Sequence, residues 1–101
     1  MKDKQIRVVV KTVDGDWEIR VIPNTLKALQ EIVGGTIECV NLSPYHVLVC
    51  NEEGRINGMK FNCNVGGHQI FGDFLVAETD GEEFVSLDEH DAECVAWILR
   101  K

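Results

Sequence analysis

The strongest constraint on the fold is a pair of alternating segments in residues 5–22. Apolar and polar side chains alternate there with a period of two, which is typical of β-strands that turn one face to a core. Between the two segments stands Asp14-Gly15, a dipeptide favoured in two-residue hairpin turns, where both positions need a positive φ. The sequence therefore predicts a β-hairpin whose register pairs Val8 with Val21, Val10 with Ile19 and Lys11 with Glu18.

Two segments carry helix signals. The first, residues 26–33, follows two candidate N-cap residues, Asn24 and Thr25, and ends at Gly34-Gly35, where a glycine suits a left-handed C-cap. The second is expected from about residue 87 to 100, after a capping box with Ser86 at the cap. The side chains expected to face inward are Leu26, Leu29, Ile32 and Val33 in the first helix and Ala92, Val95, Ile98 and Leu99 in the second.

The remaining patterned segments complete an α+β fold. Residues 51–67 are rich in Asn and Gly and are interpreted as the least structured part of the chain. The resulting order, β-β-α-β-β-β-β-α, predicts a mostly antiparallel sheet of about six strands with two helices. The length of 101 residues suits one domain over 1–101 with one hydrophobic core. The further strands are expected at 36–42, 46–50, 70–79 and 83–85.

The negative charge is concentrated towards the C-terminal end. Ten Lys and Arg against 17 Asp and Glu give a net charge of −7. Residues 1–72 hold eight acidic and eight basic side chains, whereas residues 73–101 hold nine acidic and two basic ones, which accounts for the whole of the −7. This distribution argues against direct binding to nucleic-acid phosphates, which needs a basic surface. Four of the acids that lie outside the expected helix N-terminus form a candidate partner surface, namely Glu78, Asp80, Glu82 and Glu83.

The other composition signals exclude several function classes. No apolar run reaches the roughly 18–20 residues of a membrane span, and the first residues lead into a strand rather than a signal peptide. The four cysteines are therefore expected to be reduced in a cytoplasmic protein. The cysteines and the three histidines lack the short spacings of a structural zinc site, and no known catalytic motif is present. We expect no cofactor, no metal and no catalytic residue.

The polar segment between residues 51 and 62 is the candidate site for a small ligand. Amide side chains supply both donors and acceptors, and a guanidinium supplies a planar fork of donors, so together they suit a small polar molecule. The competing interpretation is a solvated loop in which Asn and Gly only permit turns. The candidate ligand-binding residues are Asn51, Glu52, Arg55, Asn57, Lys60 and Asn62.

Three parts of the chain resemble a small family of unknown function that is encoded mostly by bacteriophages, plasmids and Firmicute mobile elements. The resemblance rests on the predicted helix with its Gly-Gly end and the strand after it, on Asn51-Glu52-Glu53-Gly54 with Gly58 and Asn62, and on Phe71-Gly72-Asp73-Phe74. The chain departs from the family at Met59-Lys60-Phe61, where members often carry prolines. The resemblance implies a mobile-element setting and no particular chemistry.

These observations favour a non-enzymatic accessory protein of a phage or mobile element that acts by binding in the host cytoplasm. It would sequester a small signalling ligand or block a host factor. Two alternatives stay open: a protein–protein inhibitor or regulator that uses the acidic surface of residues 73–93, and an enzyme of an unrecognised type. The expected partners are a small polar ligand or a host protein, with no direct nucleic acid and no membrane, and a homo-oligomer remains open.

Overall fold

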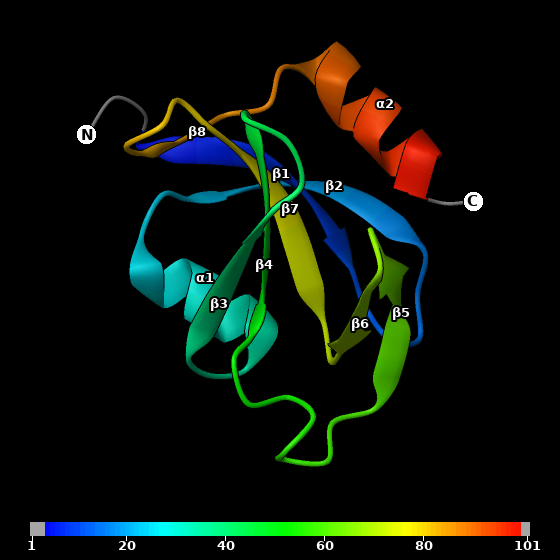
Figure 1. Ribbon diagram of the computed structural model, residues 1–101. Coiled ribbons are helices and arrows are strands. Elements are labelled where there is room, and N and C mark those ends of the chain that lie inside the picture. The colour runs from blue at the N-terminus through cyan, green and yellow to red at the C-terminus, as the bar shows by residue number, and fades with distance from the viewer. Residues whose placement is uncertain (1–3, 100–101) are drawn as a thin grey trace.

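The computed structural model describes residues 4–99, with the Leu99 side chain outside the described part (Figure 1). The predicted α+β class, with two helices and a mostly antiparallel sheet of about six strands, is confirmed. Along the chain, the elements are β1 (Gln5–Lys11), β2 (Trp17–Pro23), α1 (Leu26–Val33), β3 (Ile37–Asn41), β4 (His46–Asn51), β5 (Phe61–Val65), β6 (His68–Phe71), β7 (Phe74–Thr79), β8 (Phe84–Val85) and α2 (Glu89–Leu99).

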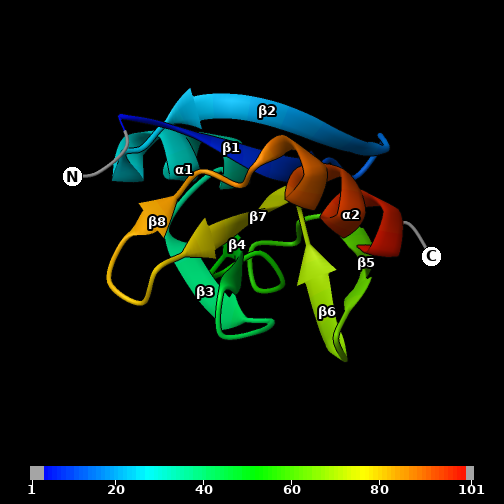
Figure 2. The ribbon, with the colours of Figure 1, turned by 90° about the horizontal axis from the view of Figure 1, so that it is seen from above.

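The main sheet has the strand order β2-β1-β7-β4-β3, with β8 paired to one end of β7. Every pairing is antiparallel. Helix α1 covers one face, while α2 and the separate β5–β6 hairpin cover the other (Figures 1 and 2). The two edges of the sheet are therefore β2 and β3.

The three inner strands are buried on both faces, so their sequences are continuously apolar rather than alternating. On the α1 face, Val8 and Val10 pack in one cluster with Leu29 and Val33 of the helix. On the opposite face, Val9 packs in a second cluster with side chains of β4, β7 and α2. Each face thus has its own hydrophobic layer, and the sheet separates the two.

The predicted register of the first hairpin is wrong by one residue. The observed pairs are Val10 with Glu18 and Val9 with Ile19. Gly15 does not have the positive φ of the expected turn, and residues 12–16 form a longer loop instead. The physical reason is tertiary: the Asp73 carboxylate accepts a hydrogen bond from Val13 N at 2.9 Å, and this contact holds the loop from outside the hairpin.

The segment after β4 is more ordered than its composition indicates. Residues 61–65 form β5, which pairs with β6 across a turn at Gly66 and Gly67, both with positive φ. The strand expected at 70–79 is split, because Gly72 has φ 84° and turns the chain between β6 and β7. The loop interpretation therefore holds only for the connection that precedes β5.

Both helices form, with corrections to their ends and faces. Thr25 caps α1 by accepting a hydrogen bond from Ala28 N, and Gly34 ends it with φ 79°, as expected. Leu26, expected inside, is exposed. In α2 the cap is Asp88 rather than Ser86, since Asp88 Oδ1 accepts from Asp91 N at 2.7 Å. Ile98, also expected inside, is 62% exposed because α2 packs through the small side chains of Ala92 and Ala96.

Candidate functional site

Asn51, the first of the predicted ligand-binding residues, is used inside the fold. It is buried at the end of β4. Its Nδ2 donates to Val33 O at 3.1 Å, and its Oδ1 accepts from Glu53 N at 2.7 Å. These two bonds join the end of α1 to the loop after β4. Both the nitrogen and the oxygen of this amide are therefore already hydrogen-bonded within the fold.

Asn62 has a similar internal role in β5. Its Nδ2 donates to Lys11 O at 3.1 Å and to Gly72 O at 2.9 Å. These bonds attach the β5–β6 hairpin to the end of β1 and to the turn before β7. Its Oδ1 is buried and has no hydrogen-bond partner among the described residues.

The other four predicted ligand-binding residues are exposed on the connection around residues 52–60. The Arg55 guanidinium lies 5.7 Å from the centre of the Phe71 ring. Lys60 Nζ forms an exposed ion pair with Asp14 Oδ1 at 2.9 Å. Glu52 and Asn57 stand at the surface. The structure thus brings Arg55 to Phe71 and Lys60 to Asp14, without collecting the six side chains around one point.

The predicted partner surface divides into two parts. Asp80, Glu82 and Glu83 lie on the β7–β8 turn, where Asp80 Oδ1 accepts from the N–H groups of the other two at 3.0 Å each. Glu78 lies on β7 and is half-buried opposite His46. Its pKa is raised by burial and by the Asp91 carboxylate, and a weaker lowering comes from His46. Glu78 therefore faces α2 and is separate from the three acidic residues of the β7–β8 turn.

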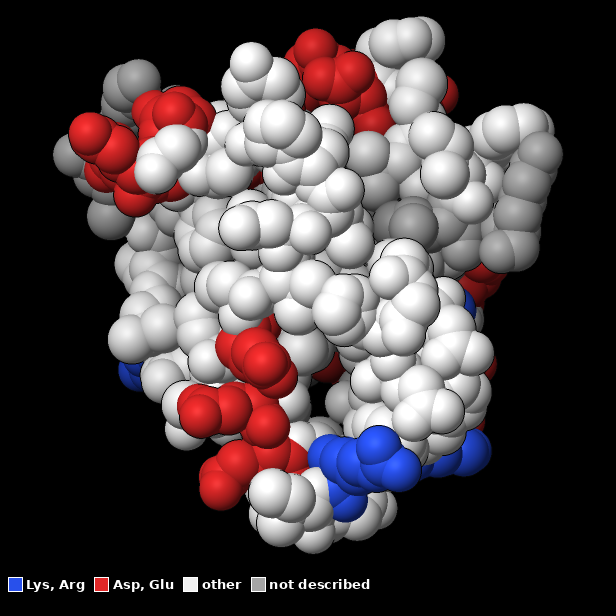
Figure 3. Space-filling view, viewed as in Figure 1, with Lys and Arg blue, Asp and Glu red and all other residues white. Residues whose placement is uncertain are grey.

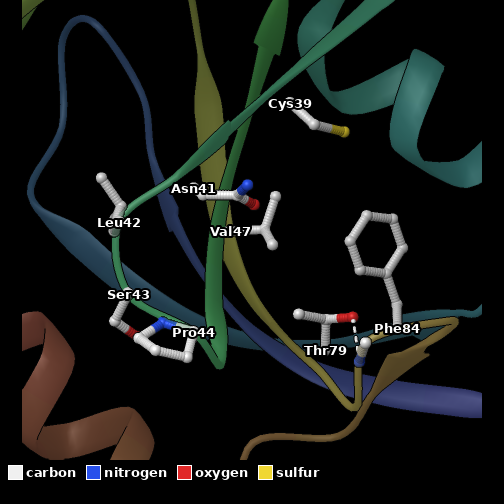
Figure 4. Close-up of a pocket in the computed structure, with 9 residues that line it drawn as sticks. Cys39, Asn41, Leu42, Ser43, Pro44, Val47, Thr79 and Phe84 are labelled. Atoms are coloured by element: carbon white, nitrogen blue, oxygen red, sulfur yellow. Dashed lines mark hydrogen bonds between the residues drawn. The ribbon is translucent and has the colours of Figure 1, made fainter.

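A groove of about 450 Å³ lies beside that turn on the α1 face of the sheet (Figure 4). We call it the β3 groove. Cys39 and Asn41 of β3 and Val47 of β4 form one wall, and Thr79 and Phe84 form the other. The β3–β4 turn and Gly81 close one end. A second hollow of about 290 Å³ adjoins it, sharing Thr79 and Phe84 and reaching Glu82 and Glu83.

One side of the β3 groove is an open strand edge. Leu42 N donates to His46 O, and Glu52 N donates to Thr36 O, so the even-numbered residues of this strand bond to β4. The N–H and C=O groups of Ile37, Cys39 and Asn41 must then point away from the sheet. Cys39 and Asn41 are exposed, and within residues 4–99 no strand pairs with this edge.

The surroundings of the groove are acidic. Figure 3 shows acidic side chains gathered at the upper left, over the position of the β7–β8 turn in Figure 1. Exposed Glu38 stands on β3 itself. Among the described residues that line the groove and the adjoining hollow, none is Lys or Arg. Burial raises the pKa of the Cys39 thiol, and Glu38 raises it further, so this thiol is mostly protonated at neutral pH.

Comparison with known proteins places the chain in a family. Residues 6–99 match the model of a domain of unknown function, DUF3846. The chain belongs to this family. The search of curated proteins and the search of solved structures gave no match.

In this DUF3846 domain, the residues that carried the resemblance surround Met59. A Cβ at Gly34 would lie 3.4 Å from Met59 Cε, and Cβ atoms at Gly54 and Gly72 would lie 3.5 Å and 2.8 Å from its Sδ. A side chain at Gly72 would therefore collide with Met59, whereas the contacts at Gly34 and Gly54 with Met59 are ordinary ones. At Gly54 the close contact would be with the main chain, because a Cβ there would lie 2.8 Å from Phe71 O. Gly54 and Gly72, together with Asn51 and Asn62, thus have a structural role.

The outer face of α2 is a second exposed surface of the DUF3846 domain. Trp97 is 59% exposed and lies beside exposed Ile98. They border a shallow hollow of about 470 Å³ with His90, Glu93 and Cys94, in which Cys94 Sγ lies 3.6 Å from His90 Nε2. Among residues 4–99 there is no group of three or more potential metal ligands, and no helix there is long and apolar enough to cross a membrane.

Sequence reasoning found the acidic turn and missed the groove beside it. Cys39, Asn41 and Phe84 come from segments far apart in the sequence, and only the fold brings them together. One signal was available. β3 is a short strand of five residues that carries a charged side chain, Glu38, and a polar one, Asn41, and short strands with charged side chains are typical of sheet edges.

Proposed function

We propose that this chain is a non-enzymatic accessory protein of a mobile genetic element that binds a host protein in the host cytoplasm and thereby blocks it. The mobile-element setting rests on the sequence resemblance. The binding role rests chiefly on one observation, the β3 groove with an open strand edge on one side and the acidic β7–β8 turn at its end. Such an edge provides main-chain donors and acceptors for an incoming segment.

The charge of the site supports a basic partner. Asp80, Glu82 and Glu83 crowd one turn, and the chain as a whole carries −7. Complementary charge accelerates encounter and excludes acidic competitors. A basic segment of a host protein is therefore the ligand that this surface favours.

A small signalling ligand, the other candidate, has less support. Asn51 and Asn62 were expected to bind it, but both amides donate to main-chain carbonyls inside the fold. The basic side chains of that region stand apart, with Lys60 paired to Asp14 and Arg55 over Phe71. Among residues 4–99, the convergence of cations that an anionic ligand needs is found neither there nor in the acidic β3 groove.

Selection of peptides from a random displayed library against the immobilised chain tests the proposal. We expect the selected peptides to be rich in Lys and Arg. Their affinity should fall about fivefold at low salt for Glu82→Lys, since a reversed charge at an interface rim costs on the order of 1 kcal/mol. Glu52→Lys, an equal charge change on another exposed glutamate, is the matched control and should have a smaller effect.

Two outcomes would count against the function proposed here. If the selection gave no enriched peptides, the chain would lack a peptide-binding site. If Glu82→Lys and Glu52→Lys weakened binding equally, the effect would reflect the overall charge and not the β3 groove.

A further inference from the structure

We propose that the β3 groove binds its partner by strand addition: a basic, extended segment pairs with the open edge of β3 as a further strand of the sheet. This inference rests on the proposed function and specifies its mode. The main chain of β3 would supply most of the affinity, and the groove would select among side chains.

The backbone of β3 is arranged for this pairing. Ile37, Cys39 and Asn41 direct their N–H and C=O groups outwards, because the residues between them are bonded to β4. Cys39 is the central residue of the strand. An added strand therefore gains hydrogen bonds at three alternate positions, and the β3–β4 ladder stays intact.

The side chains beside the edge define which residues fit. Residues directly opposite each other on neighbouring strands point to the same face, so the partner residues opposite Cys39 and Asn41 turn towards the groove. There they lie beside Cys39 and Asn41 at the rim of the groove, and the apolar lining behind that rim, Val47 and the Phe84 ring, favours a medium-sized apolar side chain. Thr79 lines the same wall but is already engaged, since its Oγ1 donates to Glu83 O at 3.0 Å and accepts from Gly81 N.

The acidic side chains near β3 predict which residues of the partner segment are basic. Glu38 projects from β3 to the face opposite the groove, so the partner residue across from it is expected to be Lys or Arg. A second basic residue suits the end of the groove, which is lined by Gly81 of the acidic turn. The preferred segment thus alternates apolar and basic residues.

A second copy of this chain would be a poorer occupant of the same edge. Pairing of β3 with β3 of another copy would bring together two chains that each carry −7. Like charges destabilise such an association, whereas a basic segment is attracted. Self-pairing is therefore the alternative that the experiment must be able to detect.

The test uses a short peptide of alternating lysine and valine, titrated into the full chain, with amide hydrogen exchange measured by NMR. We expect exchange to slow at the amides of Ile37, Cys39 and Asn41. The amides of Glu38 and Val40, already bonded to β4, serve as internal controls. The same peptide N-methylated at alternate residues should bind about tenfold more weakly, as expected for the loss of one or two net hydrogen bonds.

Two variants of Cys39 distinguish the contribution of its main-chain N–H to peptide binding from that of its side chain. Cys39→Pro removes an outward N–H without breaking a bond to β4, and proline is tolerated on edge strands. Cys39→Ala keeps that N–H and removes the thiol alone. We expect weaker peptide binding for Cys39→Pro than for Cys39→Ala. If Cys39→Pro does not fold, the exchange measurement on the wild-type chain decides by itself.

The outcomes keep this inference distinct from the proposed function. If library-selected peptides bind while the three outward amides exchange as fast as before, or if N-methylation has no effect, strand addition is wrong and the binding proposal stands. If the alternating lysine–valine peptide does not bind, strand addition by a basic segment is overturned. Protection of these amides in the chain alone, increasing with its concentration, would identify a second copy as the occupant.

Discussion

Met59 shows how one side chain depends on the glycine beside it. Gly72 has φ 84°, and a Cβ there would lie 2.8 Å from Met59 Sδ. We expect Gly72→Ala to reduce the free energy of unfolding by more than the roughly 1–2 kcal/mol of a left-handed alanine. Gly58→Ala is the control, because Gly58 has φ 72° and nothing lies within 4 Å of its Cβ position. The free energies are measured by denaturant unfolding. If both variants lost the same amount, the Met59 side chain would have moved aside to accommodate the added methyl group.

Glu78 is the residue whose titration is most informative. Burial raises the pKa of this carboxyl, Asp91 and Asp88 raise it further, and His46 opposes them. A carboxyl with a raised pKa binds its proton more tightly in the folded chain than in the unfolded one, so its charged form destabilises the fold at neutral pH. The destabilisation disappears as the pH falls through that pKa range.

The expected outcome is that Glu78→Gln stabilises the chain at neutral pH by up to about 1 kcal/mol, given that the site is partly solvated. The gain should vanish at about pH 3, well below the pKa of an ordinary glutamate, where the side chain is protonated in the unfolded chain as well. Denaturant unfolding at both pH values measures it, with exposed Glu52→Gln as the control. A loss of stability at neutral pH would show that the attraction between Glu78 and His46 outweighs burial and repulsion.

At the scale of elements, α2 depends on its cap and on the chain that leads into it. Arg7 N donates to Ser86 Oγ, and Leu87 N donates to Arg7 O, so the segment before α2 is held against β1. Asp88 then caps the helix. We expect Asp88→Ala to reduce the free energy of unfolding by about 0.5–2 kcal/mol, and Asp88→Asn, which keeps the acceptor, to have little effect. If both variants lost the same free energy of unfolding, the stabilisation would come from the charge of Asp88 and not from its hydrogen bond at the helix N-terminus.

The sequence predicted those elements whose signals are local. Helix α1 lies between Thr25 and Gly34, and both act within one turn of the helix, so its ends were found. The hairpin register and β5 depend instead on contacts that join distant segments, from Asp73 to Val13 and from Asn62 to Lys11 and Gly72. Periodicity carries no information on such contacts.

In the candidate site, too, local features could be predicted from the sequence and contacts between distant segments could not. The acidic turn is a local cluster and was found from composition, whereas the roles of Asn51 and Asn62 as internal amides were not. Each bonds to a carbonyl on another segment, so a polar pattern alone did not distinguish a ligand-binding amide from a structural one.

At the scale of the whole molecule, both sheet faces are covered, and the surfaces left open include the sheet edges at β2 and β3 and the outside of α2. The two tryptophans report on the outside of α2. Trp17 is 7% exposed and meets the Phe74 ring edge-to-face at 5.3 Å, whereas Trp97 is 59% exposed. An exposed indole rimmed by Glu93 is accessible to solutes unless another chain covers it.

We therefore expect two distinct fluorescence populations. Trp17→Phe, which leaves Trp97, should emit at longer wavelength and be quenched readily by acrylamide, and Trp97→Phe should show the reverse. Trp97→Phe should also leave the free energy of unfolding nearly unchanged, because little apolar surface is buried there. The measurement is repeated over a range of protein concentrations. Protection of Trp97 that grows with concentration would contradict the open surface and show that α2 joins two copies, which the net charge of −7 on each copy disfavours.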